Sequence, residues 1–155
     1  MPQLTKGGKY VFGWSRIRED GAIYLPPEAI REYQLAVQER VILISGSKTS
    51  GGIVVANRSW LEKSALAGLF EAIPGLVEFR LEPGELRRYK GRLYGWAGLE
   101  LQGKIRIPFE TLGVLALQPG DLLLSIRGSN LAFVLAARGP LVAKAREHPE
   151  IEVFG

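Results

Sequence analysis

The sequence predicts a mainly β fold with short helices, built from two tandem repeats. Two observations lead to this prediction. The chain aligns with itself at an offset of 82 positions, and each copy contains short alternating apolar segments separated by glycine and proline turns. A chain of 155 residues that is 46% hydrophobic and 23% charged has the length and composition to bury one sizeable core.

The repeat is carried by residues that rarely replace one another. Residues 12–47 align with residues 94–129 without a gap, and the identical pairs are Gly13/Gly95, Trp14/Trp96, Gly21/Gly103, Ile23/Ile105, Pro26/Pro108, Glu28/Glu110, Leu35/Leu117, Ile44/Ile126, Gly46/Gly128 and Ser47/Ser129. After a short insertion near Lys48–Gly51, Ile53–Ala56 answers Phe133–Ala136. We therefore divide the chain into a first repeat at 8–80, a linker at 81–90 that contains the turn signal Pro83-Gly84, and a second repeat at 91–155.

Each repeat is expected to begin with two strands joined by a glycine turn. The first strands are predicted at Val11–Ile17 and Leu93–Leu99, the turns at Asp20-Gly21 and Gln102-Gly103, and the second strands at Ala22–Leu25 and Lys104–Ile107. The second strands alternate, so Ile105 and Ile107 face the core and Lys104 and Arg106 face outward, free to meet a partner.

A short helix and a hairpin come next in each copy. Pro26 and Pro108 end the second strands, and helices are predicted at Pro27–Tyr33 and Phe109–Leu115. The turn Pro119-Gly120-Asp121 leads into a hairpin of Leu122–Ile126 and Leu131–Ala136, which the first copy repeats as Arg40–Ser45 and Ile53–Ala56.

A second helix and a final strand close each copy. Ser59 and Glu62 fit a capping box, which predicts a helix running to Ala72. The second copy has its helix between Pro140 and His148. Final strands are predicted at Leu76–Phe79 and Ile151–Phe154.

This series of elements resembles the AbrB/SpoVT swapped-hairpin domain. The residues that carry the resemblance are Gly103 to Pro108, Glu110, Leu117 and Pro119-Gly120-Asp121; in the first copy Val37-Gln38-Glu39 replaces the last turn. In that family two copies interlock their hairpins into one β-barrel, and two copies in one chain, as in MraZ-like members, can build it as an intrachain pseudo-dimer. A copy of about 40 residues is too small to bury a core alone, which agrees with this arrangement.

The resemblance implies a transcriptional regulator that binds double-stranded DNA in a sequence-specific way. We expect no enzyme, since no catalytic set of residues is evident, and an enzyme is the third option after the two binding functions. A net charge of +4 agrees with an anionic partner. The residues predicted to contact DNA are basic and lie near the two glycine turns and the starts of the repeats: Lys9, Arg16, Arg18, Arg87, Arg88, Lys90, Arg92, Lys104 and Arg106. A homo-oligomer through the helices or the barrel is a further expectation.

The chain departs from the family at positions that often carry arginine. After the turn glycines it has Ala22 and Lys104, and four residues after the prolines it has Ile30 and Leu112. The alternative is therefore a structural or protein-interaction module that kept the barrel and lost DNA binding. An antitoxin is a variant of this alternative, although the long tail typical of antitoxins is missing.

Other chemistry finds little support in the sequence. With no cysteine and one histidine, His148, the chain offers no spaced set of metal ligands, and no glycine-rich phosphate loop or catalytic triad is evident, so we expect neither metal nor cofactor. Trp14 and Trp96 are expected to pack in the core or in an interface, with stacking on bases as the other option, and Trp60 is expected to pack against the barrel from its helix. The lack of cysteine, signal peptide and membrane-length apolar run favours the cytoplasm.

Overall fold

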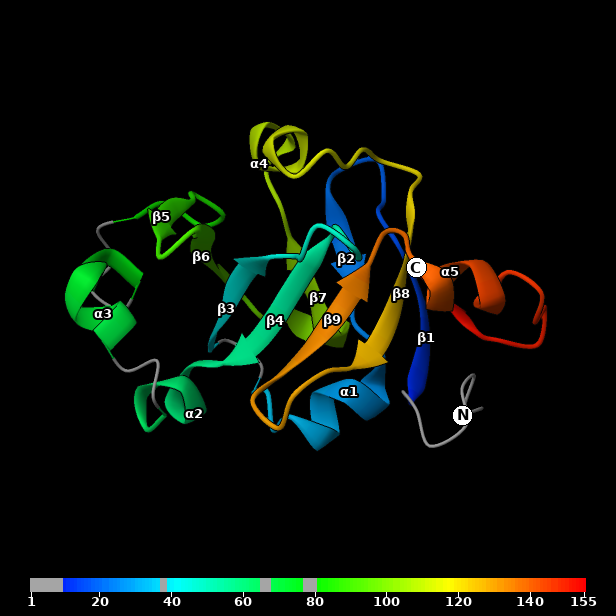
Figure 1. Ribbon diagram of the computed structural model, residues 1–155, viewed down its shortest axis with the longest axis horizontal. Helices are drawn as coiled ribbons and strands as arrows, with labels where there is room; N and C mark the ends of the chain where they lie inside the picture. The colour runs from blue at the N-terminus through cyan, green and yellow to red at the C-terminus, as the bar shows by residue number, and fades with distance from the viewer. Residues whose placement is uncertain (1–9, 37–38, 65–67, 77–80) are drawn as a thin grey trace.

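The computed structural model describes residues 10–36, 39–64, 68–76 and 81–155 (Figure 1). The first half contains β1 (Val11–Arg16), β2 (Ala22–Tyr24), α1 (Pro27–Glu32), β3 (Arg40–Ser45), β4 (Ile53–Asn57), α2 (Arg58–Glu62), α3 (Gly68–Ala72) and the 3-10 turn η1 (Pro74–Leu76). The second half contains β5 (Arg87–Tyr89), β6 (Arg92–Gly98), the 3-10 turn η2 (Leu101–Gly103), β7 (Lys104–Arg106), α4 (Phe109–Val114), β8 (Leu122–Arg127), β9 (Ala132–Ala136), α5 (Pro140–Ala145) and β10 (Val153–Phe154). The predicted class, mainly β with short helices, is confirmed.

The strands form an eight-stranded sheet in the order β10-β1-β8-β9-β4-β3-β6-β5 and a separate ladder of β2 with β7. Among the residues that the structure describes, β1 and β10 pair in parallel and the other neighbouring strands pair antiparallel. The order interleaves the two halves, because the hairpin β3–β4 lies beside β6 and the hairpin β8–β9 lies beside β1. Neither half therefore has a sheet of its own.

The strand register follows the offset that aligns the sequence with itself. Ile23 pairs with Ile105, 82 positions later in the chain. Trp14 of β1 pairs with Leu124 of β8, and Trp96 of β6 pairs with Ile42 of β3. Trp14 aligns with Trp96 and Ile42 aligns with Leu124, so the two pairs are equivalent under the offset. Each first strand thus pairs with the hairpin of the other half at an equivalent register.

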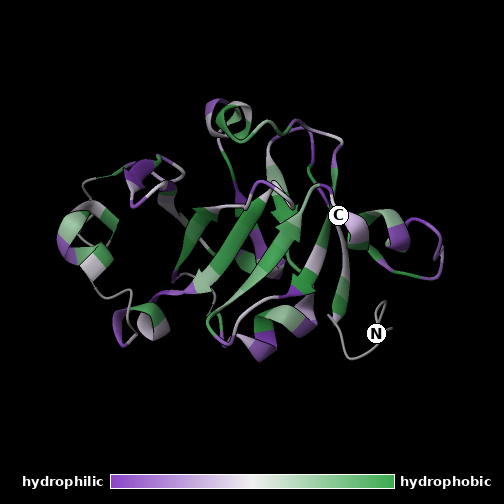
Figure 2. Cartoon of the chain, in the orientation of Figure 1, coloured by the Kyte–Doolittle hydropathy of each residue, from purple (hydrophilic) through white to green (hydrophobic). Residues whose placement is uncertain are grey.

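The core draws on both halves. Phe12, Ile23, Ile105, Leu123 and Phe133 belong to one cluster, and all five are fully buried. Two smaller clusters flank it, one beneath α2 and α3 and one beneath α5. Figure 2 shows apolar residues along the central strands and polar residues on the turns and the helix surfaces. In the part of the chain that the structure describes, no helix has the length and apolarity needed to cross a membrane.

The predicted helix from Ser59 to Ala72 is wrong in its extent and its cap. Asn57, rather than Ser59, occupies the N-cap, and its side-chain oxygen accepts a hydrogen bond from the backbone N–H of Trp60 at 3.2 Å. Helix α2 ends at Glu62, and the next residue, Lys63, has the non-helical angles φ −96° and ψ 4°. Ser64 Oγ donates a hydrogen bond to the carbonyl of Leu61 at 2.7 Å. A serine that bonds back to the preceding turn competes with helical continuation.

Two other segments differ from their sequence interpretation. Leu76, predicted to start a strand, ends the 3-10 turn η1, and residues 77–79 lie outside the described residues. The segment 81–90 does contain the predicted turn at Pro83-Gly84, but it also contributes β5, which extends the sheet by pairing with β6. No inward–outward alternation marks this strand, because Arg87 and Arg88 are both exposed.

Candidate nucleic-acid interface

The ladder of β2 with β7 is held together at its ends by the two motif glycines. The backbone N–H of Ile107 donates to the carbonyl of Gly21 at 3.0 Å, and the N–H of Leu25 donates to the carbonyl of Gly103 at 2.8 Å. Gly21 has φ +83°, and a Cβ there would lie 2.3 Å from the carbonyl oxygen of Ile107. Glycine is required because both the backbone conformation and the close approach exclude a side chain.

The alternation predicted for the second copy is confirmed. Ile105 and Ile107 are buried, whereas Lys104 is half-buried and Arg106 is exposed. The outward side chains of the ladder, together with neighbouring basic residues from β1 and its turn, form a surface that we call the ladder face: Arg16, Arg18, Tyr24, Lys104 and Arg106. It brings together residues from both halves of the chain, since β2 lies directly beside β7.

Tyr24 is the centre of the ladder face. The Arg18 guanidinium carbon lies 5.7 Å from the centroid of its ring, and the Lys104 ammonium nitrogen lies 5.8 Å from it. Both cations are within reach of a cation–π interaction with the ring. The Tyr24 hydroxyl donates to Gln102 Oε1 at 3.4 Å, and its backbone carbonyl accepts from Ser15 Oγ at 2.8 Å. The ring therefore positions one cation from each half.

Arg106 differs from the other cations because two carboxylates hold it. Its Nη1 lies 2.6 Å from Asp20 Oδ2, and its Nε lies 3.4 Å from Glu100 Oε2. The backbone N–H of Ala22 and then the Arg106 guanidinium hold the pKa of Asp20 below its usual range, and the same pair of acids raises the pKa of Arg106. Arg106 is therefore paired with two carboxylates in the unbound protein, and its contact with DNA stays a prediction.

The remaining cations of the ladder face carry uncompensated charge. Within the described segments of the chain, Arg16, Arg18 and Lys104 make no ion pair with an acidic side chain. Arg16 and Arg18 are exposed at the end of β1 and in the following turn. These three side chains can accept an anionic partner without first giving up a carboxylate.

The second group of predicted basic residues lies elsewhere. Arg87, Arg88, Lys90 and Arg92 lie on the hairpin of β5 and β6 at the edge of the sheet. Arg87 is paired with Glu85, and the Lys90 ammonium lies 5.4 Å from the ring centroid of Tyr89. Arg92 and Gly98 are at opposite ends of β6, about 20 Å apart at the usual rise of a strand. Since β7 follows the Gly98 end, this hairpin is separated from the ladder face (Figure 1). Lys9 lies outside the described residues.

Sequence reasoning missed one residue of the ladder face, Tyr24, and one cation contact elsewhere, that of Arg127. Tyr24 was not proposed as a contact, although its position in the alternating strand placed it on the outward face beside Lys104. Arg127, at the end of β8, bonds both carboxylate oxygens of Glu32 at 2.6 and 2.5 Å and lies 4.6 Å from the ring centroid of Tyr10. Nothing local in the sequence points to that contact, because 95 positions separate the two partners.

The tryptophans and the histidine have structural surroundings. Trp14 and Trp96 are 7% and 9% exposed, and Trp60 packs near Tyr33 with ring centroids 6.2 Å apart, as interior packing predicts. His148 Nδ1 lies 2.8 Å from Glu150 Oε1. Among the residues that the structure describes, no group of three or more His, Cys, Asp or Glu side chains could hold a metal ion.

Comparison with known proteins yields one distant structural similarity. No protein-family model matches the chain, and no curated protein matches it. The solution structure of PHS018 from Pyrococcus horikoshii is similar to it with a TM-score of 0.38 and 13% sequence identity, over 84% of this chain and 97% of that one.

Proposed function

We propose that this chain is a DNA-binding transcriptional regulator of the AbrB/SpoVT type that contacts duplex DNA through the ladder face. The observation that carries the proposal is the arrangement around Tyr24, where Arg18 from one half and Lys104 from the other flank a single aromatic ring. Lysine and arginine side chains without acidic partners are the groups that neutralise phosphates and release counterions.

We also propose that the two halves are tandem copies of one swapped-hairpin unit, interlocked as an intrachain pseudo-dimeric barrel. The strand register supports this proposal. Ile23 lies opposite its aligned residue Ile105, and the pair Trp14–Leu124 is equivalent to the pair Trp96–Ile42. A two-fold relation between the copies would generate these paired registers, because it exchanges aligned positions. It also accounts for the interleaved order of the strands.

The contacts with DNA divide between two kinds of residue. Arg16, Arg18 and Lys104 would bind phosphate oxygens, which provides salt-dependent affinity without sequence information. Arg106 is held by Asp20 and Glu100, so its charge is offset but its guanidinium has a defined direction. A positioned guanidinium is suited to a directional contact with a base edge.

Selection from a pool of random duplexes tests this function. At low salt the protein should retain DNA, and successive rounds should enrich one sequence motif. Recovery of duplexes without enrichment would mean that the chain binds phosphates alone, and a failure to retain any duplex would contradict DNA binding. The double variant Arg18→Gln/Lys104→Gln should retain much less of the pool, whereas Arg88→Gln/Lys90→Gln, which removes the same charge from the separate hairpin, should behave as the unmodified protein.

The second candidate function, a protein-interaction module, is favoured by the surface of α4. Phe109 and Val114 are 59% and 60% exposed, and the residues that align with them in α1 are Pro27 and Glu32. The apolar surface therefore belongs to one copy only. This function predicts a protein partner whose binding is lost in Phe109→Ser/Val114→Ser and retained in Arg18→Gln/Lys104→Gln, with no duplex retained in the selection.

A further inference from the structure

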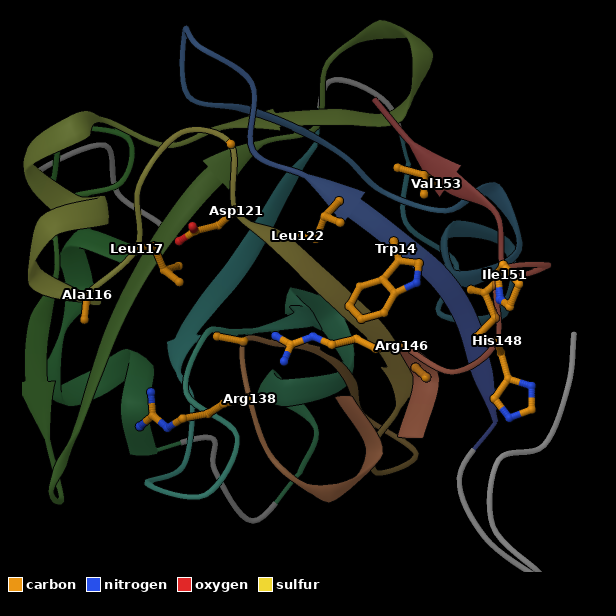
Figure 3. A pocket seen from close by; sticks show the side chains of 14 residues that line it. Trp14, Ala116, Leu117, Asp121, Leu122, Arg138, Arg146, His148, Ile151 and Val153 are labelled. Carbon is orange, nitrogen blue, oxygen red and sulfur yellow. The ribbon is translucent and has the colours of Figure 1, made fainter. Parts of the chain in front are cut away.

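A pocket of about 700 Å³ lies beside β1, and its lining residue Leu122 pairs with Arg16 of the ladder face. Figure 3 shows its lining side chains, which come from β1, the turn before β8, the segment after β9, and the chain from the end of α5 to β10. Sites for small molecules have volumes of roughly 300–1,000 Å³. The pocket is therefore large enough for a compact organic ligand.

Backbone hydrogen bonds fix two sides of the pocket to β1 and the residue that follows it. The N–H of Ile17 donates to the carbonyl of Asp121 at 2.9 Å, and the N–H of Gly120 donates to the carbonyl of Ile17 at 2.7 Å. On the other side the N–H of Trp14 donates to the carbonyl of Glu152 at 2.8 Å. These bonds hold the two walls apart, so the pocket is formed before a ligand enters.

The inner wall of the pocket is apolar. Trp14, Leu117 and Ile151 are 5–7% exposed and line it together with Leu122 and Val153. Trp96, which aligns with Trp14, has a different neighbour at the position that aligns with Leu122. Arg40, which aligns with Leu122, lies with its guanidinium carbon 4.2 Å from the ring centroid of Trp96. The corresponding residue beside Trp14 is Leu122, so no arginine at this position lies over the Trp14 ring.

The outer wall of the pocket is basic. Arg138 Nη2 donates to the carbonyl of Lys48 at 2.9 Å, which anchors its guanidinium next to the loop at 46–51. Arg146 is exposed and makes no ion pair within the described part of the chain, and its side chain extends along the pocket between Trp14 and Arg138 (Figure 3). Asp121 is the one acidic side chain in the lining, and one of its oxygens accepts from the backbone N–H of Gln118 at 3.0 Å.

We propose that this pocket is a binding site for a small organic anion, with its apolar body against Trp14 and Leu117 and its negative group on Arg146. Two arginines against one aspartate give the lining a positive balance, and a carboxylate can bond an arginine side chain through two parallel hydrogen bonds. The apolar body of such a ligand would cover the apolar wall, and its negative group would pair with the Arg146 guanidinium. The proposal does not rest on DNA binding, since none of the lining residues belongs to the ladder face.

Binding of 2-naphthoate, with 2-naphthamide as the uncharged analogue of the same shape, tests the site. Naphthoate should change the intrinsic tryptophan fluorescence in a saturable way at concentrations below a few millimolar, and naphthamide should bind at least several-fold more weakly. Arg146→Gln should weaken naphthoate binding about tenfold. The matched control is Arg88→Gln, which removes an exposed arginine from β5 and should leave the affinity unchanged. Circular dichroism of both variants confirms that they remain folded.

Changes in the NMR chemical shifts of the backbone amides on adding naphthoate locate the ligand independently. The largest changes should fall on Trp14, Asp121 and Arg146 and their neighbours. The proposal is overturned if naphthoate shows no saturable binding, if naphthamide binds as tightly, if Arg146→Gln binds as the unmodified protein does, or if the shift changes gather outside the pocket.

Discussion

Ile23 lies directly opposite Ile105 in the ladder of β2 with β7, and both side chains are fully buried. The two residues occupy aligned positions when the sequence is compared with itself, so one contact joins the two halves at those positions. The same ladder presents Tyr24 and Lys104, which are also paired in register, on its outward side. The core contact of the two halves and the candidate DNA surface are therefore opposite sides of one structural element.

Truncation of either isoleucine should destabilise the whole chain. Ile105→Ala and Ile23→Ala should each lower the free energy of unfolding by about 2–5 kcal/mol, because each removes buried methyl groups and leaves a cavity at the junction of the halves. Leu101→Ala is the control: this leucine is 71% exposed, and its truncation should change stability by about 0.5 kcal/mol or less. Equilibrium urea unfolding measures the differences, and an isoleucine variant as stable as Leu101→Ala would contradict the packing described for this ladder.

The glycine of the first turn offers a matched comparison. Gly21 and Gly91 both have φ +83°, but a Cβ on Gly21 would meet the carbonyl of Ile107, whereas one on Gly91 would meet nothing within 4 Å. Gly91→Ala should cost about 1 kcal/mol from the backbone conformation alone. Gly21→Ala should cost about 1–3 kcal/mol more, since the strand must also move away from the new methyl group. Equal destabilisation of the two variants, measured by thermal or urea unfolding, would show that the close approach to Ile107 is unimportant.

The Asp20 carboxylate, which accepts from the backbone N–H of Ala22 and pairs with Arg106, should give the protein a pH-dependent stability. The pKa of Asp20 is lowered in the folded state, so the charged carboxylate stabilises the fold above its unfolded pKa of about 3.9, and this contribution is lost as the pH falls through the folded pKa. Asp20→Asn retains an oxygen that can accept from the N–H of Ala22, and thus isolates the charge. Urea unfolding should find the variant less stable at pH 7 and equal to the unmodified protein near pH 2. A difference that persists unchanged at pH 2 would assign the effect to something other than the carboxylate charge.

The sequence predicted local features of the fold well, because they follow from alternation and turn chemistry. The buried positions of Ile105 and Ile107, the start of α1 at Pro27 and the hairpin strands all follow from neighbouring residues. It failed where a distant partner decides the outcome. Asp20 lies 86 positions from Arg106, so the pairing that offsets this arginine has no local signal. The Asn57 cap was overlooked because Ser59 also satisfied the capping pattern.

The site was predictable only in part for the same reason. The ladder face combines residues from β1, the turn after it, β2 and β7, and the sequence named four of its five members. The sequence also grouped these residues with Arg87, Arg88, Lys90 and Arg92, which lie near Lys104 along the chain. It did not indicate that the full length of β6 separates the two groups in space. The pocket beside β1 was not anticipated, because four separate segments form its walls.

The most direct test of DNA binding through the ladder face is fluorescence anisotropy with a labelled duplex over a series of salt concentrations. The unmodified protein should bind at low salt, and the logarithm of its affinity should fall linearly with the logarithm of the salt concentration. Arg18→Gln/Lys104→Gln should reduce the steepness of that slope by about two, close to one for each phosphate that is no longer neutralised. Arg88→Gln/Lys90→Gln should leave it unchanged. Absence of binding at low salt, affinity that does not respond to salt, or a slope reduced only by the β5–β6 variant would contradict the account.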